Sequence, residues 1–143
     1  MGPTSGNELM LEINTIIKSI KKSESNIRTY KEKIDSAEEF YESINSFIND
    51  FKETIDSHYK QVANYSKMLD KDSTFGNYYE LQINKILYGK DNAEINELAS
   101  NSKAKIIKQI KEYEEKIRYE KSNINLCKQK LEKLKSTINS LNI

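Results

Sequence analysis

The chain has 143 residues, of which 31% are charged and 36% hydrophobic, with four glycines, one proline and no tryptophan. This composition favours helices over turns, and it predicts a long, narrow seam of apolar contacts rather than a thick core. The 23 basic and 22 acidic residues are intermingled and give a net charge of +1, so the basic surface that nucleic-acid binding requires is not expected.

Residues 1–7 precede the helical pattern and contain the only proline and two of the four glycines. We expect them to be a disordered leader or an expression remnant, followed by a single domain over residues 8–143. No basic segment followed by an apolar one is present, and no apolar run approaches the roughly 18 residues of a membrane span. A soluble protein without membrane insertion is therefore expected.

Apolar residues recur in alternating steps of three and four from Ile13 to Leu69, with only two exceptions. Neither glycine nor proline interrupts this frame, so we predict one long helix over about residues 8–70, roughly 90 Å in length. The sequence SAEE beginning at Ser36 has the form of a capping box, which makes a break near Ser36 the alternative. The unshifted frame favours a continuous helix.

The frame is lost over residues 70–92. Asn77 and Glu80 have capping-box spacing, and the apolar residues after them predict a short amphipathic helix over about residues 77–88. Gly89 is expected to end this short helix in a left-handed cap.

A second long helix is predicted over about residues 92–141. Asp91 and Glu94 supply its start signal, and a second frame of apolar residues follows with Lys103 and Glu120 as its exceptions.

Two long helices joined this closely must fold back on each other. The sequence therefore predicts an all-α fold, a long antiparallel, coiled-coil-like helical hairpin with a short helix at the turn. The seam contacts that hold it are expected from the apolar residues nearest its middle: Ile44, Ile48, Phe51, Ile55, Ile106, Ile110, Tyr113 and Ile117.

Polar residues within the two frames have two interpretations. Ser23, Lys103 and Glu120 either fix the register and the choice of partner or mark places where the helices separate. His58 also lies in the frame, and we expect it to be a satisfied or partly exposed seam residue rather than a ligand.

Catalytic and metal-binding residues are not evident in the sequence. Cys127 is the only cysteine, which excludes an intrachain disulfide, and its core-facing position predicts burial. A glycine-rich phosphate loop, a pair of acid–base carboxylates and an activated nucleophile are not recognisable. We therefore expect no enzyme activity, no metal and no cofactor.

Aromatic residues gather at the predicted turn, where they can either cover the end of the hairpin or bind a partner. These residues are Phe75, Tyr78, Tyr79 and Tyr88.

The residues Leu87, Tyr88 and Gly89, followed by KDNAE, resemble the turn of the Trp-x-Gly (WXG-like) family of small type VII secretion proteins. The longer coiled-coil members that accompany LXG toxins are the most similar. Leu87 stands at the tryptophan position and Gly89 at the glycine position. The resemblance extends over the hairpin in outline and over residues 87–94 in detail. The family's Tyr-x-x-x-Asp/Glu export signal does not occur here, so it would be supplied by another chain.

The resemblance implies a partner or targeting chaperone of an LXG toxin in a Gram-positive bacterium, present in the cytoplasm and open to export through the type VII system. The expected partner is a helical protein, either the N-terminal domain of the toxin or a second small helical protein, with self-association as a further expectation. Two alternatives are a structural coiled-coil segment of a larger assembly and a helical toxin-immunity protein, which a helix break near Ser36 would favour.

Overall fold

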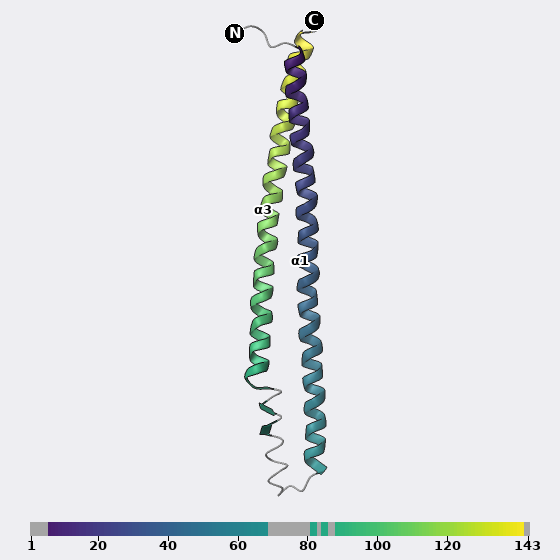
Figure 1. Ribbon diagram of the computed structural model, residues 1–143, viewed down its shortest axis with the longest axis vertical. Coiled ribbons are helices and arrows are strands. Elements are labelled where there is room, and N and C mark those ends of the chain that lie inside the picture. Colours follow the sequence, from purple (N-terminus) through teal and green to yellow (C-terminus); the bar gives the residue numbers. More distant parts are fainter. Residues whose placement is uncertain (1–5, 69–80, 83, 86–87, 142–143) are drawn as a thin grey trace. The chain divides into compact units, whose positions relative to one another are not determined.

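The computed structural model describes residues 6–68, 81, 82, 84, 85 and 88–141. Two long helices account for nearly all of these residues, α1 (Gly6–Met68) and α3 (Lys90–Leu141). They pack antiparallel as a helical hairpin (Figure 1), so the predicted all-α hairpin is confirmed. The short helix predicted over residues 77–88 falls largely outside the described residues.

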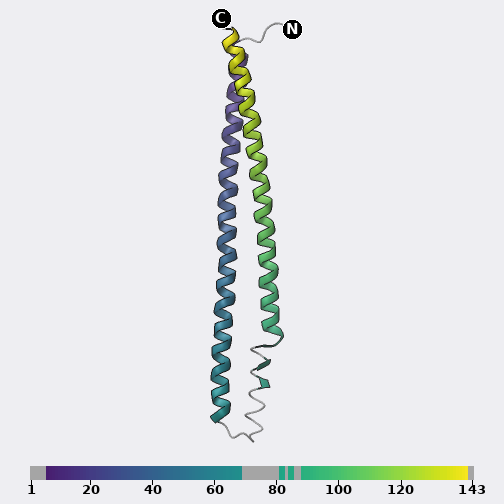
Figure 2. The same ribbon diagram turned by 180° about the vertical axis from the view of Figure 1, so that it is seen from behind.

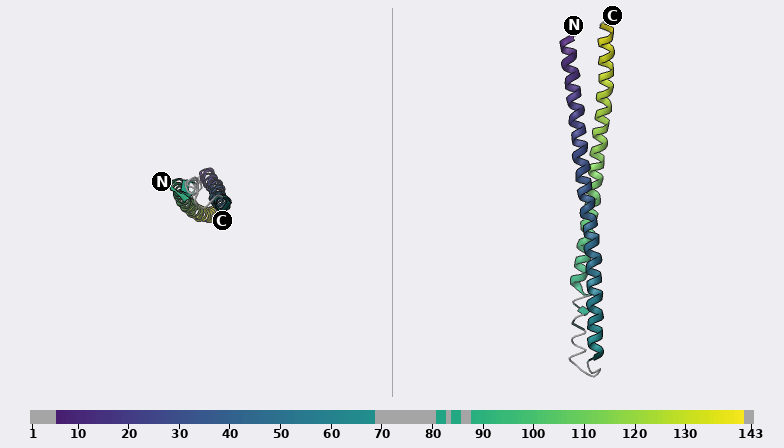
Figure 3. Two further views of the ribbon diagram at one scale, coloured as in Figure 1. Left: turned by 90° about the horizontal axis from the view of Figure 1, so that it is seen from below. Right: turned by 90° about the vertical axis from the view of Figure 1, so that its right-hand side faces the viewer.

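The contacts along the hairpin divide the chain into two units, each built from a part of both helices. Unit 1 comprises residues 1–36 and 109–143, and unit 2 comprises residues 37–108. In unit 1 the beginning of α1 lies beside the end of α3, and the two helix ends meet at the same end of the unit (Figures 1 and 3). In unit 2 the remainder of α1 runs antiparallel to the beginning of α3 (Figure 2).

Helix α1 continues without interruption through Ser36, so the alternative of a break at this point is not realised. The apolar frame explains why the capping signal at Ser36 does not start a new helix. Ala37 and Tyr41 follow the signal at helical spacing, and both are half-buried against the rest of unit 2. Packing of an apolar side contributes more to helix stability than a local cap does.

The start of α1 lies two residues earlier than predicted, so Gly6 and Asn7, expected in the leader, are helical. Leu9 explains this difference. It lies one step before Ile13 in the same frame and is only 4% exposed, so the buried side of the helix begins before the first residue that we had counted.

The buried side of α1 follows the predicted frame from Ile13 to Ile55, since every frame position in this interval is buried or half-buried. His58, the next position, is exposed and is therefore a surface residue. The described seam of α1 ends at Ile55.

The start of α3 corrects the prediction for Gly89. No residue in the described ranges has a left-handed backbone, Gly89 included, so the expected left-handed cap is wrong. Instead, the carbonyl of Gly89 accepts a hydrogen bond from the amide of Ala93 at 3.2 Å, which is the first bond of α3. Gly89 is thus the N-cap of α3, a position where glycine is well tolerated. Asp91 lies in the first turn, where its charge favours the helix dipole.

Candidate functional site

Buried polar contacts join the two helices of unit 1. Ser23 is 3% exposed, and its hydroxyl accepts a hydrogen bond from Nδ2 of Asn123 at 2.9 Å. One turn further along α1, Asn26 donates a hydrogen bond to Oε1 of Glu120 at 3.2 Å. The helices are therefore in contact at Ser23 and Glu120, which favours the register-fixing interpretation of these residues over separation of the helices.

A third contact continues the same register. Cys127 donates from its thiol to the hydroxyl of Ser19 across 3.7 Å, and it is 8% exposed, so its predicted burial is confirmed. Each step of one turn along α1 is matched by an equal and opposite step along α3. Three successive layers of unit 1 therefore carry polar groups that meet in only one alignment of the helices.

Removal of the Asn123 amide tests this register. Asn123→Leu is expected to lower the free energy of unfolding by about 1–3 kcal/mol, because it leaves the buried Ser23 hydroxyl without its donor. The double variant Ser23→Ala with Asn123→Leu is expected to recover most of the loss, since both polar groups are then gone. Urea unfolding followed by circular dichroism measures both. Additive losses in the double variant would show that the two residues are not coupled.

Aromatic rings and lysines form the next layers of unit 1. The rings of Tyr30 and Tyr113 stack with their centroids 5.9 Å apart and their planes at 29°. Lys33 lies over the Tyr113 ring at 5.6 Å, and Lys116 lies 5.7 Å from the Tyr30 centroid and 5.4 Å from that of Tyr113. These distances are within the range of cation–π attraction, so the layer combines apolar contact with charge on the solvent side.

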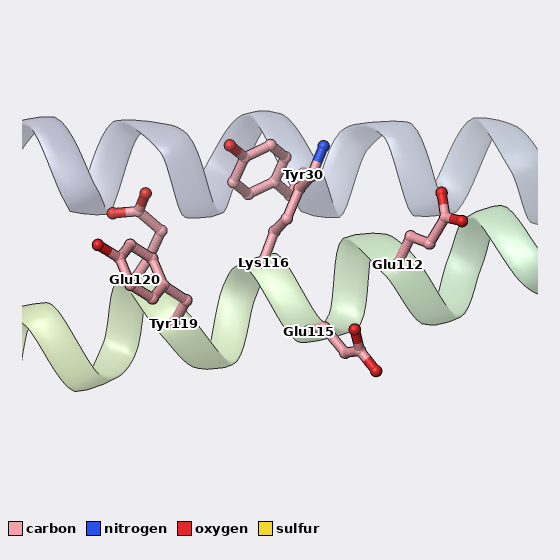
Figure 4. Close-up of a pocket in the computed structure, with 6 residues that line it drawn as sticks. All are labelled: Tyr30, Glu112, Glu115, Lys116, Tyr119 and Glu120. Carbon is pink, nitrogen blue, oxygen red and sulfur yellow. The ribbon is translucent and has the colours of Figure 1, made fainter.

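A surface hollow of about 460 Å³ lies beside Tyr30. Figure 4 shows Lys116 and Glu120 directed from α3 towards α1, whereas Glu115 points away from it. Five of the six lining residues come from α3, so the hollow lies mainly along the surface of one helix. Among the residues that the structure describes, no group of three His, Cys, Asp or Glu side chains is placed to hold a metal ion.

The remaining polar exception, Lys103, lies between the helices of unit 2. Its ammonium donates a hydrogen bond to Oδ1 of Asn45 and lies 5.3 Å from the centroid of the Tyr41 ring. The three polar frame residues considered as register-fixing, Ser23, Lys103 and Glu120, are thus paired across the hairpin.

A second hollow, of about 190 Å³, lies in unit 2. Ile48, Phe51 and Ile55 contribute its apolar side, and polar side chains of both helices complete it. Among these, Asn96 donates hydrogen bonds to the carbonyl and to Oδ1 of Asn92, each at 3.0 Å. The volume is below the roughly 300 Å³ at which small-molecule sites begin, so the hollow is too small for a substrate.

Tyr88 connects the residues before α3 to α1. Its ring meets that of Tyr59 edge-on, with centroids 5.4 Å apart, and its hydroxyl donates to Oδ1 of Asp56 at 3.3 Å. Partial removal from water raises the pKa of Tyr88 above its ordinary value of 10.0, and the neighbouring Asp56 carboxylate raises it further. Tyr88 is still 48% exposed, so it both covers part of α1 and presents a ring edge to solvent.

The predicted turn motif is described only in part. Tyr88 and Gly89 lie at the start of α3 as stated above. The other proposed turn residues, Leu87, Phe75, Tyr78 and Tyr79, lie outside the described residues.

The proposed seam residues lie on the sides of α1 and α3 that face each other. Three of them are buried, namely Ile55, Ile106 and Ile117, and the others are half-buried: Ile44, Ile48, Phe51, Ile110 and Tyr113.

Sequence reasoning missed the asparagines that pair with the polar seam residues. Asn26 and Asn123 each immediately precede an isoleucine of the frame, and Asn45 immediately follows one. Asparagine at such flanking positions was a usable signal, because its side chain can reach across the seam while its own position stays at the edge.

Large apolar side chains remain exposed on both helices and on the described residues between them. Among the described residues these are Met10, Leu11, Ile17, Phe40, Phe47, Tyr59, Leu81, Tyr88, Leu98, Ile107, Tyr119, Leu126 and Leu141. Within the residues that the structure describes, neither α1 nor α3 contains a stretch that is long and apolar enough to cross a membrane. Exposed apolar side chains of this kind can form contacts with another protein.

Comparison of the chain with known protein families, with curated proteins and with solved structures finds no match.

Proposed function

We propose that this protein is a non-enzymatic helical interaction protein, and that another helical chain binds along its hairpin and covers the exposed apolar side chains. One observation carries the proposal. Among the described residues, eight apolar residues are buried, whereas thirteen large apolar side chains are exposed. Most of the other seam residues are only half-buried, so the two helices leave apolar surface that another chain can cover.

The finer proposal is that the partner is a type VII secretion toxin of the LXG type, and that this protein binds its N-terminal helices as a partner or targeting chaperone. The antiparallel hairpin and the resemblance of residues 87–94 to the Trp-x-Gly turn support it. Under this proposal the protein acts in the cytoplasm of a Gram-positive bacterium before the toxin is exported, and the export signal resides in another chain.

The toxin-immunity alternative has less support. It was tied to a helix break near Ser36 and a compact bundle of four helices, whereas α1 runs through Ser36. The structural coiled-coil alternative predicts association through copies of this chain alone.

Co-purification tests the proposal. The chain is co-expressed with the N-terminal helical segment of an LXG toxin, and the complex is isolated through a tag on the toxin segment. We expect a stable complex, and we expect Ile107→Ser with Tyr119→Ser to weaken it by about tenfold or more, equivalent to ~1.4 kcal/mol. Both side chains are exposed, at 43% and 73%, so the variant should keep its helicity.

Asn101→Ser serves as the matched control, since Asn101 is an exposed polar residue of the same helix. Leu87→Ser is expected to reduce toxin loading while circular dichroism stays unchanged. Absence of a complex between the wild-type chain and the toxin segment would contradict the type VII assignment.

A further inference from the structure

Unit 2 is poorer in core than unit 1. Of the buried apolar residues described, only Ile55 and Ile106 belong to unit 2, and the other six belong to unit 1. Unit 2 nevertheless exposes Phe40, Phe47 and Leu98 by 58%, 57% and 68%. These three apolar side chains therefore lie outside the contact between the two helices of unit 2.

The two phenylalanines share one side of α1. They are seven residues apart, or about two helical turns, which places them on the same face. The Phe47 ring stacks on half-buried Phe51, with centroids 6.0 Å apart and planes at 11°. This contact holds the exposed ring in place, so little side-chain entropy remains to be lost when a partner covers it.

The surface between the two rings can be desolvated at little cost. Ser43 lies on the same side of the helix, between Phe40 and Phe47, and its hydroxyl already donates to the carbonyl of Glu39 at 2.9 Å. Because the Ser43 hydroxyl already has its acceptor within α1, burial does not leave it without a hydrogen bond. The small side chain of Ser43 also lets another helix approach closely between the two phenylalanine rings.

Asp50 and Lys105 bring charges of opposite sign to the two ends of the stretch of unit 2 that carries Phe40 and Phe47. Asp50 follows Phe47 by one turn on α1. Lys105 follows Leu98 by two turns on α3, and the contact of Lys103 with Tyr41 places Lys105 near the level of Phe40. If a second copy of the chain packs on this face with its α1 antiparallel to the first, the acidic end of one copy lies against the basic end of the other.

Complete coverage of Phe40, Phe47 and Leu98 by a second copy would bury an apolar area comparable with that of a small dimer interface. With roughly 200 Å² for each complete side chain, the exposed parts of Phe40, Phe47 and Leu98 amount to about 350 Å² per copy. Two copies together then bury about 700 Å² of apolar surface. This is the apolar share, near 60%, of an interface of about 1,200 Å² at the lower end of the standard size.

We infer that a second copy of this chain covers the Phe40–Phe47 face of unit 2 in a two-fold arrangement. The α1 helices of the two copies run antiparallel, with Phe40 of each copy against Phe47 of the other and Ser43 near the two-fold axis. The inference rests on the proposed function, since both assume that another chain covers the apolar side chains that are left in solvent.

Light scattering on the purified full chain tests the stoichiometry. We expect twice the 16.7 kDa of one chain at micromolar concentration, and a single-chain mass for the variant Phe40→Ser with Phe47→Ser. Met10→Ser with Leu11→Ser removes two comparably exposed apolar side chains from unit 1 and should keep the dimer. Circular dichroism verifies that each variant is helical. A single-chain wild type, or a dimer that survives loss of both phenylalanines, would overturn the inference.

Cross-linking tests the orientation in a Cys127→Ser background. Ser43→Cys is expected to form a disulfide-linked dimer under mild oxidation, because the two copies of this position lie close together at the axis. Ser25→Cys, on the exposed side of α1 in unit 1, is the control and should remain largely monomeric. Equal rates of cross-linking for the two variants would rule out the two-fold arrangement.

The two proposals fail in different ways. If the Phe40→Ser, Phe47→Ser variant is a single chain that still captures the toxin segment, the dimer face is separate from the toxin-binding surface and both proposals stand. If the wild type is dimeric through this face but does not bind the toxin segment, the type VII assignment fails and the dimer remains.

Discussion

Replacement of Ile106 by aspartate is expected to destabilise the hairpin by about 4 kcal/mol. Ile106 is 6% exposed, so the change removes a packed side chain and places a carboxylate in the seam. Unit 2 has few other buried apolar residues among those described, which leaves little to compensate for the loss. Urea unfolding followed by circular dichroism measures the change.

Ile107 provides a control of the same residue type on the same helix. It is 43% exposed, so Ile107→Asp should alter the free energy of unfolding by no more than about 0.5 kcal/mol. Similar unfolding midpoints for the two aspartate variants would mean that the seam does not pass through Ile106 as described.

Replacement of Gly89 by alanine is the second large effect expected, about 1–3 kcal/mol of destabilisation. A Cβ at this position would lie 1.9 Å from the carbonyl oxygen of Lys85, a main-chain atom that cannot move without displacing the chain ahead of α3. Thermal unfolding and the protection of the first α3 amides against hydrogen exchange both report the change.

Gly6→Ala is the matched control for Gly89→Ala. A Cβ at Gly6 meets no atom within 4 Å, and Gly6 is the first residue of α1. Alanine is the better helix-former, so this variant should be neutral or more stable by up to about 1 kcal/mol. If Gly89→Ala also stabilised the protein, the close approach to Lys85 would not exist.

The fold was predictable because its information is repeated along the chain. Every frame position from Ile13 to Ile55 indicates the same buried side of α1. A single misleading signal, such as the capping box at Ser36, therefore does not change the prediction of one continuous helix. The antiparallel direction followed from the short connection between the two frames, since chain length alone prevents a parallel return.

The details that failed depend on single residues or on the pairing of the two helices. Gly89 carries a turn signal, but that signal does not tell whether the residue ends one helix or begins the next, and in the structure it accepts the first hydrogen bond of α3. The partners of Ser23 and Lys103 depend on the register between the helices, and this is set by contacts across the hairpin. His58 is exposed, which agrees with one of the two states expected for it.

The candidate binding surface was less predictable than the fold. The sequence directed attention to the turn, whereas Phe40, Phe47 and Leu98 lie along the helices, outside both seam frames. An apolar residue beside a seam has the same appearance in sequence whether it widens the core or remains in solvent. Only the packed hairpin distinguishes these two outcomes, because it shows which apolar side chains the second helix fails to cover.

Size-exclusion chromatography with light scattering tests the central claim most directly, when applied to the chain alone and mixed with the N-terminal helices of an LXG toxin. The account predicts an assembly heavier than one chain in both samples, and a toxin-containing assembly in the mixture. A monomer that resists dilution, melts cooperatively and remains a monomer in the mixture would contradict the claim that another helical chain covers the hairpin.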